Sequence, residues 1–195
     1  SNSAFKNEYV TELAATLAFS ATKNNDKVGL ILFSDNVELY IPPKKGKSHV
    51  LRIIRELLEF KSKSKKTDIN VPLKFVSNIL KNRSIAFIIS DFISQDYSNS
   101  LKIFSSRHDV TGIRVYDQTE EIIPNLGVID INDNETGKRI TVNTTSKNLR
   151  KKYNEYYNSK RNEFIDFFKR SGSGIIECNT QDDYQKKLLK YFKSR

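Results

Sequence analysis

The chain has 195 residues, 37% of them hydrophobic, with seven glycines and four prolines, a composition that excludes disordered and collagen-like chains. One cysteine, Cys178, and two histidines exclude an internal disulfide framework and argue against a Cys/His zinc site. The formal net charge of +10 is concentrated in residues 44–66 and 147–170, which suggests a partner surface more than a generally cationic protein.

The first part of the chain predicts alternating helices and strands. Apolar residues at every fourth position indicate a helix over 5–21. The apolar run 28–33 and the alternating run 37–41 then predict a hairpin of one buried and one half-exposed strand. Helices follow over about 50–58 and 71–80, separated by a loop, 61–66, that consists only of lysine and serine. This order of elements is typical of an α/β protein.

Residues 84–92 form the stretch around which the fold is organised. The five consecutive apolar residues 85–89 lack the alternation of a half-exposed strand. We therefore expect a central strand of a parallel sheet, with helices covering both of its faces. The run ends at Ser90 and Asp91, and ligands of open α/β sheets bind beyond the carboxyl ends of their strands. Asp91 is therefore either a helix cap or a ligand for a bound group.

The remainder of the chain predicts a helix over 97–107, a strand over 110–116, a hairpin of 128–131 with 139–142, and a long helix that begins after Ser146. A strand at 175–178 and a last helix complete the pattern. No linker separates these parts, so we expect one domain over 1–195, with a core over 5–117 and a C-terminal part over 126–195. The apolar runs are much shorter than the roughly 20 residues that cross a bilayer.

The chain contains none of the common nucleotide-binding or hydrolase motifs, and Cys178 lies in an apolar strand where a buried core role is expected. The remaining candidates for chemistry are oxygen donors at loops, namely Ser34, Asp35, Thr67, Ser90, Asp91 and Asp117. Hard cations such as Mg²⁺ bind carboxylate and hydroxyl oxygens, so Thr67 and Asp91 are candidates to share one ion. The same residue types are also expected as caps of helices.

Several of these segments together resemble a known bacterial family. They are 26–33, 37–43 with Gly46, 49–51, Thr67-Asp68, 88–92, 108–110, 116–124, 133–137 and 180–188. In their order and spacing they are similar to the von Willebrand factor A-like proteins labelled domain of unknown function fifty-eight. The resemblance implies a Rossmann-like, mostly parallel sheet flanked by helices. It also implies a metal-ion-dependent adhesion site at the carboxyl edge of that sheet.

The resemblance assigns Thr67 and Asp91 to the second and third parts of this metal site. The first part, an Asp-x-Ser-x-Ser loop, has no acidic counterpart before the first helix, and the first central strand is expected to be missing with it. We therefore expect an incomplete site, with Mg²⁺ or Mn²⁺ bound only by the intact protein. We also expect the resulting gap in the sheet to close, either by direct pairing of the neighbouring strands or by self-association with another chain.

The leading functional hypothesis is a non-enzymatic adaptor domain that binds a protein partner. The resemblance implies a MoxR-type AAA+ ATPase as this partner, and a cytoplasmic location with a membrane tether in upstream segments. The alternative is binding of nucleic acid or another anionic surface through 44–66 and 147–170, which we consider less favoured because a solvated charged face explains the same residues. A phosphohydrolase using Asp91 and Asp117 ranks last, since two-metal hydrolysis needs more acids than these loops supply.

Overall fold

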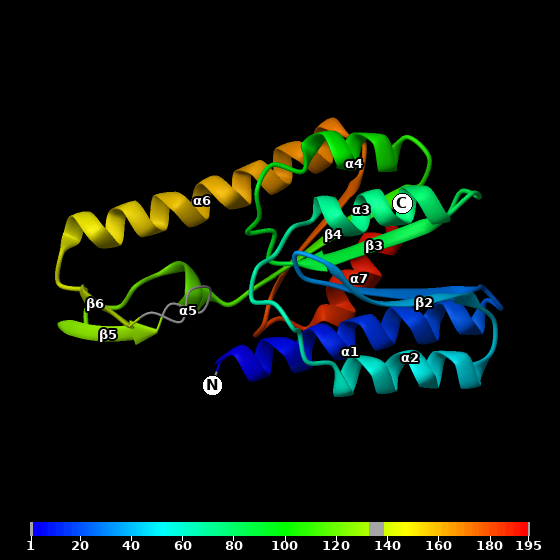
Figure 1. Ribbon diagram of the computed structural model, residues 1–195, viewed down its shortest axis with the longest axis horizontal. Coiled ribbons are helices and arrows are strands. Elements are labelled where there is room, and N and C mark those ends of the chain that lie inside the picture. The colour runs from blue at the N-terminus through cyan, green and yellow to red at the C-terminus, as the bar shows by residue number, and fades with distance from the viewer. Residues whose placement is uncertain (1, 133–138, 195) are drawn as a thin grey trace.

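The computed structural model describes residues 2–132 and 139–194 (Figure 1). Its centre is a parallel sheet of three strands in the order β3-β4-β7, with bounds Ile85–Ser90, Asp109–Tyr116 and Gly174–Asn179. In register, Ile88 of β3 lies opposite Gly112 of β4, and Gly112 lies opposite Ile175 of β7. The chain therefore has the α/β architecture with a parallel sheet that its sequence predicts.

Two antiparallel hairpins are separate from this sheet. The first consists of β1 (Val28–Phe33) and β2 (Val37–Lys44), and the second of β5 (Val128–Asn132) and β6 (Arg139–Asn143). The sequence predicts both hairpins, the first from an apolar run followed by alternating apolar residues, and the second from two short strands joined by a polar turn. The predicted connection of the second hairpin falls largely on residues 133–138, which lie outside the described residues.

Helices cover both faces of the parallel sheet. On one face lie α3 (Asn70–Ile79), α4 (Ser98–Ser105) and the second half of α6 (Lys147–Arg170), whose buried side chains meet around Phe92. On the other face lie α1 (Asn2–Lys23) and α7 (Tyr184–Lys193). The helix α2 (Lys47–Glu59) packs beside α1 and the first hairpin (Figure 1). The core is therefore divided into two clusters by strand β4, whose alternate residues face one cluster or the other.

The packing of α6 on β4 depends on the absence of a side chain at Gly112. A Cβ atom at this position would lie 2.5 Å from Phe168 Cε1 and 2.7 Å from Phe164 Cε2. Both phenylalanines are fully buried, and the Phe164 ring stacks on Phe92 at 4.3 Å between centroids. These aromatic residues of the basic segment 147–170 are core residues, as their spacing predicts.

The expected central position of the 84–92 strand is wrong for the described residues. β3 is an edge strand, and Ile85 is 66% exposed. β4 is the central strand instead, because it pairs with β3 on one side and β7 on the other, and its residues from Val110 to Val115 are buried.

Direct pairing of β1 with β3, one of the two ways in which we expected the sheet to close, is also not found. Within the described residues, β1 pairs with β2 alone and β3 with β4 alone. Each of these strands therefore keeps one edge whose backbone groups have no strand partner. The apolar sequence of β3 fits a strand covered on both faces, whereas its free edge is of the kind with which a further strand can pair.

The first half of α6 extends beyond the sheet, and the helix begins near the β5–β6 hairpin (Figure 1). Ser146 caps this helix, since its hydroxyl accepts a hydrogen bond from the Leu149 amide. The short helix α5 (Gln118–Glu121) lies beside it, and the Tyr153 hydroxyl donates to the Glu120 carbonyl oxygen at 2.9 Å. In the described residues no helix has the length and hydropathy needed to cross a bilayer.

Candidate functional site

Three loops meet at the carboxyl edge of the strands. The carbonyl oxygen of Ser34, directly after β1, accepts a hydrogen bond from the Asp68 amide at 3.0 Å. The Thr67 carbonyl oxygen accepts one from the Ser94 hydroxyl, and this hydroxyl also accepts from the Ile69 amide, both at 3.3 Å. The loops after β1, before α3 and after β3 are thus hydrogen-bonded to one another. We call this surface, residues 34–36, 67–68 and 90–95, the carboxyl rim.

The loop that contains Asp91 has a constrained backbone. Asp91 Oδ1 accepts a hydrogen bond from the Ile93 amide at 3.2 Å, and the Ser90 hydroxyl accepts one from the Phe92 amide at 3.1 Å. Phe92 has a φ of 60°, in the left-handed region that bulky residues rarely adopt. The buried Phe92 side chain, 1% exposed, holds this conformation in place, because it packs between α4 and α6. The backbone turn therefore presents Asp91 at the rim.

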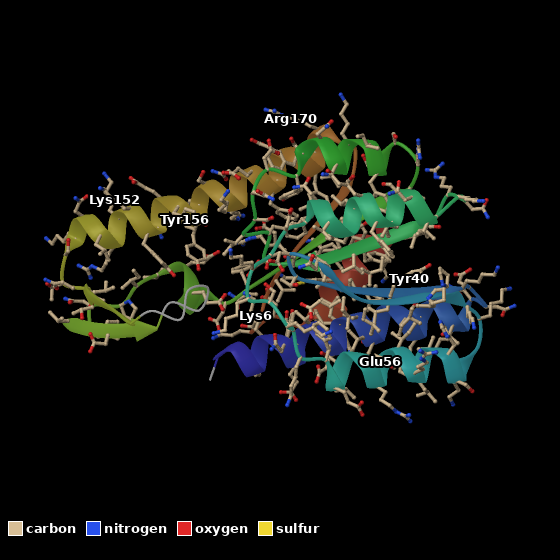
Figure 2. The ribbon with its side chains drawn as sticks, viewed as in Figure 1. Lys6, Tyr40, Glu56, Lys152, Tyr156 and Arg170 are labelled. Carbon is tan, nitrogen blue, oxygen red and sulfur yellow. The ribbon has the colours of Figure 1, made fainter. Side chains whose placement is uncertain are left out.

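The carboxylate of Asp91 already faces a cation from this chain. Lys6 of α1 places its ammonium nitrogen 3.4 Å from Asp91 Oδ2 and 2.7 Å from Glu120 Oε2. Burial lowers the pKa of Lys6, but the two carboxylates outweigh this effect and leave the pKa above its usual value. Figure 2 shows Lys6 near the start of α1, on the side of α5. The Lys6 side chain therefore remains charged and neutralises the Asp91 carboxylate.

The predicted metal ligands share the carboxyl rim but do not fit a metal ion by themselves. Thr67 is exposed and Asp91 is half-buried, and they lie on loops that Ser94 joins. Mg²⁺ prefers six oxygen ligands, whereas this pair offers two, and one of them is paired with the Lys6 ammonium. In the part of the chain that the structure describes, no group of three or more His, Cys, Asp or Glu side chains is placed to hold a metal.

The hydrogen bonds of Asp68 and Asp117 indicate structural roles for these two residues. Asp68 is a local cap, since its carboxylate accepts from the Asn70 amide at 2.9 Å and from the Gln95 side chain at 2.7 Å. Asp117 is buried at the end of β4, next to β3 in the sheet, and its carbonyl oxygen accepts from the Glu120 amide. The structure therefore places Asp117 at the same edge of the sheet as Asp91.

The cysteine and the two histidines either are buried in the core or contact backbone groups. Cys178 is fully buried, and burial raises the pKa of its thiol, as expected for an inert core residue. His108 is 4% exposed, and its Nδ1 accepts from the Ser84 amide at 3.3 Å. His49 Nε2 lies 2.9 Å from the Val28 carbonyl oxygen. The His108 ring also packs on Phe104, with 4.5 Å between the ring centroids.

Sequence analysis did not identify Lys6 or Glu120 as site residues. They are separated by 114 positions, and a single lysine in a helix carries no signal for its partner. A second ion pair anchors the same end of α5: Arg114 of β4, whose side chain is 3% exposed, contacts the neighbouring Glu121 at 2.7 Å. Together the two pairs join α5 to the edge of the sheet.

Several curated proteins are similar to this chain along its length. The Mycobacterium tuberculosis protein Rv1480 is 20% identical over 97% of this chain and 61% of its own length. The Mycobacterium avium protein MAV169 is 26% identical over 59% of this chain and 68% of its own length. The chain thus spans about three fifths of the length of the first of these relatives.

Two solved structures share the fold. The BatB protein of Bacteroides thetaiotaomicron has a TM-score of 0.60 at 16% identity, over 96% of this chain and 87% of that chain. An aerotolerance-related membrane protein from Bacteroides fragilis, solved with multiple mutations to serines, has a TM-score of 0.59 at 18% identity, over 97% and 89%. At these identities the likeness shows the fold alone. A family model matches residues 1–163, and the chain therefore belongs to the family described as Protein of unknown function DUF58.

Proposed function

We propose that this chain is a non-enzymatic protein-interaction domain of the von Willebrand factor A type, and that its carboxyl rim contacts the partner. The observation that carries this proposal is the hydrogen bonding among the three loops, from Asp68 to Ser34 and from Ser94 to Thr67. These bonds make the rim a fixed surface at the edge where open α/β sheets bind their ligands. A fixed surface loses little conformational freedom on binding.

The state of the reactive side chains supports a role without catalysis. Cys178 is buried with a raised pKa, and His108 and His49 contact backbone groups rather than a hydroxyl or thiol nucleophile. Asp91 is paired with Lys6, which does not suit a general base. We therefore assign the rim to binding.

A MoxR-type AAA+ ATPase is the partner that we propose, on the strength of the family resemblance. The same resemblance supports a cytoplasmic domain tethered to the membrane by segments outside this sequence. One protein of similar fold is described as an aerotolerance-related membrane protein, which agrees with such a tether.

We propose binding of a divalent ion only for a longer protein that supplies the remaining ligands. Thr67 and Asp91 of this chain lack the remaining ligands, and Lys6 already neutralises Asp91. Isothermal titration calorimetry should therefore detect no Mg²⁺ or Mn²⁺ binding by residues 1–195. A protein that also contains an Asp-x-Ser-x-Ser loop should bind the ion, and Asp91→Ala should abolish this binding. Equal heats for that protein and its Asp91→Ala variant would remove the metal site from the proposal.

Binding of the ATPase tests the rim directly. We expect Asp91→Asn to weaken binding to the MoxR-type ATPase by about tenfold in biolayer interferometry, the effect typical of an important interface residue. Asp166→Asn is the matched control, because Asp166 is an exposed carboxylate of α6 far from the rim in sequence. If both variants bind as the wild type does, the rim is not the contact surface.

A further inference from the structure

The loop between α2 and α3 concentrates positive charge at the carboxyl rim. Residues 61–66 contain four lysines and two serines, and all four lysines are exposed. We call this segment the lysine loop. None of its ammonium groups forms an ion pair with a carboxylate of the described residues. Within the described chain these four lysines therefore have no direct ion-pair partner.

Glu38 of the first hairpin holds the lysine loop. Glu38 Oε2 accepts a hydrogen bond from the Lys63 amide at 2.8 Å, and Glu38 Oε1 accepts one from the Ser62 hydroxyl at 2.7 Å. Asp35 lies in the turn of the same hairpin, and the neighbouring Ser64 side chain lowers the pKa of its carboxyl group. The Glu38 carboxylate contacts amide and hydroxyl groups of the loop rather than its ammonium groups. The loop is thus fixed to the hairpin while its lysine side chains remain available to a partner.

The lysine loop leads directly into the carboxyl rim. Lys66 is followed by Thr67, whose carbonyl oxygen is bonded to Ser94. In Figure 1 the segment between α2 and α3 passes the turn of the β1–β2 hairpin, on the side of the sheet from which α1 begins. A partner that contacts Thr67 or Asp91 would therefore meet this positive charge.

We infer that the lysine loop recognises an acidic segment of the protein partner. This inference rests on the proposed function and adds the chemistry of the partner. Four lysines attract carboxylates, and the fixed backbone that carries them orders little on binding. Single-stranded nucleic acid is the less suitable ligand, because residues 61–66 include no aromatic side chain on which a base can stack.

A fluorescein-labelled oligoglutamate peptide is the probe, with fluorescence anisotropy at ionic strengths of about 0.05 and 0.15 M as the measurement. Replacing the four lysines of the loop (Lys61, Lys63, Lys65 and Lys66) by Gln should weaken binding by about tenfold at the lower ionic strength. The control replaces four basic residues of α6 (Lys147, Arg150, Lys151 and Lys152) by Gln, which removes the same formal charge. This control should change the affinity by less than about twofold.

The Glu38→Gln variant distinguishes recognition by a fixed loop from attraction by an excess of positive charge alone. The variant raises the net charge by one, so general electrostatic attraction predicts equal or tighter binding of the peptide. Recognition by a fixed loop predicts weaker binding, because the Lys63 amide and the Ser62 hydroxyl lose a charged acceptor. Equal or tighter binding by Glu38→Gln would overturn the inference, as would equal losses in the two fourfold variants.

Two further measurements complete the test. If a labelled single-stranded oligonucleotide binds more tightly than oligoglutamate through the same four lysines, the ligand is nucleic acid and the inference is overturned. Binding to the MoxR-type ATPase separates the two proposals. If Asp91→Asn loses this binding while the lysine-loop variant keeps it, the proposed function stands and the acidic-segment inference falls.

Discussion

The Lys6 ammonium donates a hydrogen bond of 2.7 Å to Glu120 Oε2 and so joins the start of α1 to α5. The same nitrogen lies 3.4 Å from Asp91 Oδ2 at the carboxyl rim. The Lys6 side chain is 16% exposed, whereas each carboxylate is about one third exposed. One lysine therefore connects the first helix, the rim and the base of the segment that carries the β5–β6 hairpin.

Lys6→Met should lower the free energy of unfolding by about 1–2 kcal/mol, because it leaves two carboxylates near each other without their shared cation. Urea denaturation monitored by circular dichroism measures this change. Lys74→Met is the control, since Lys74 is exposed on α3 and a surface change of this kind alters stability by less than about 0.5 kcal/mol. Equal stability of the two variants would show that the Lys6 contacts contribute nothing.

The free edge of β3 should be visible in amide hydrogen exchange. In a parallel edge strand, alternate amides point away from the neighbouring strand, so alternate amides of Ala86–Ser90 should exchange rapidly. The amides of Val110–Val115 in β4 should exchange slowly throughout, because β4 has a partner on both sides.

The same experiment tests closure of the sheet by self-association. If a second copy supplies the covering strand, protection of β3 should increase as the protein concentration is raised. Uniform protection of β3 at every concentration would contradict a free edge, and a dilution series with size measurement by light scattering provides the check.

Gly112→Ala should destabilise the protein by about 1–3 kcal/mol, the usual effect of overfilling a packed core. The added Cβ atom would meet Phe168 at 2.5 Å and Phe164 at 2.7 Å, and these buried rings have little room to move. Thermal unfolding measures the loss. Combining Gly112→Ala with Phe168→Leu should recover part of it, because the smaller side chain makes room for the methyl group. A purely additive double variant would show that the two positions do not compete for space.

The anchoring of the lysine loop should depend on pH. Hydrogen bonds from Ser34, the Lys63 amide and Ser62 lower the pKa of Glu38 to about 2, from an unfolded value of about 4.3. A carboxyl group with a lowered pKa stabilises the fold above its unfolded pKa, and this stabilisation is lost as the pH falls through the folded value. The stability difference between the wild type and Glu38→Gln should therefore be constant above about pH 5 and vanish towards pH 2. A difference that does not change with pH would exclude this carboxylate as the anchor.

The sequence itself determines the order and type of most elements. The four-residue spacing of apolar side chains in α1, the alternation in β2, the polar turn between the strands of the second hairpin and the cap at Ser146 are local signals. They correctly predict a helix, two hairpins and a helix start. The apolar run that became β3 was also correctly identified as a strand. The position of Cys178 in an apolar strand correctly indicated a buried residue.

Tertiary structure alone decided which strand is central and what Asp91 contacts. β3 is the more continuously apolar of the two strands, but β4 is central because β7, more than sixty residues later, pairs with its second edge. Lys6 reaches Asp91 and Glu120 across 85 and 114 positions of sequence. Helix and strand patterns depend on neighbours within a few residues. The strand order and the ion pairs depend instead on how distant segments of the chain return to the same edge of the sheet, and local periodicity does not encode this.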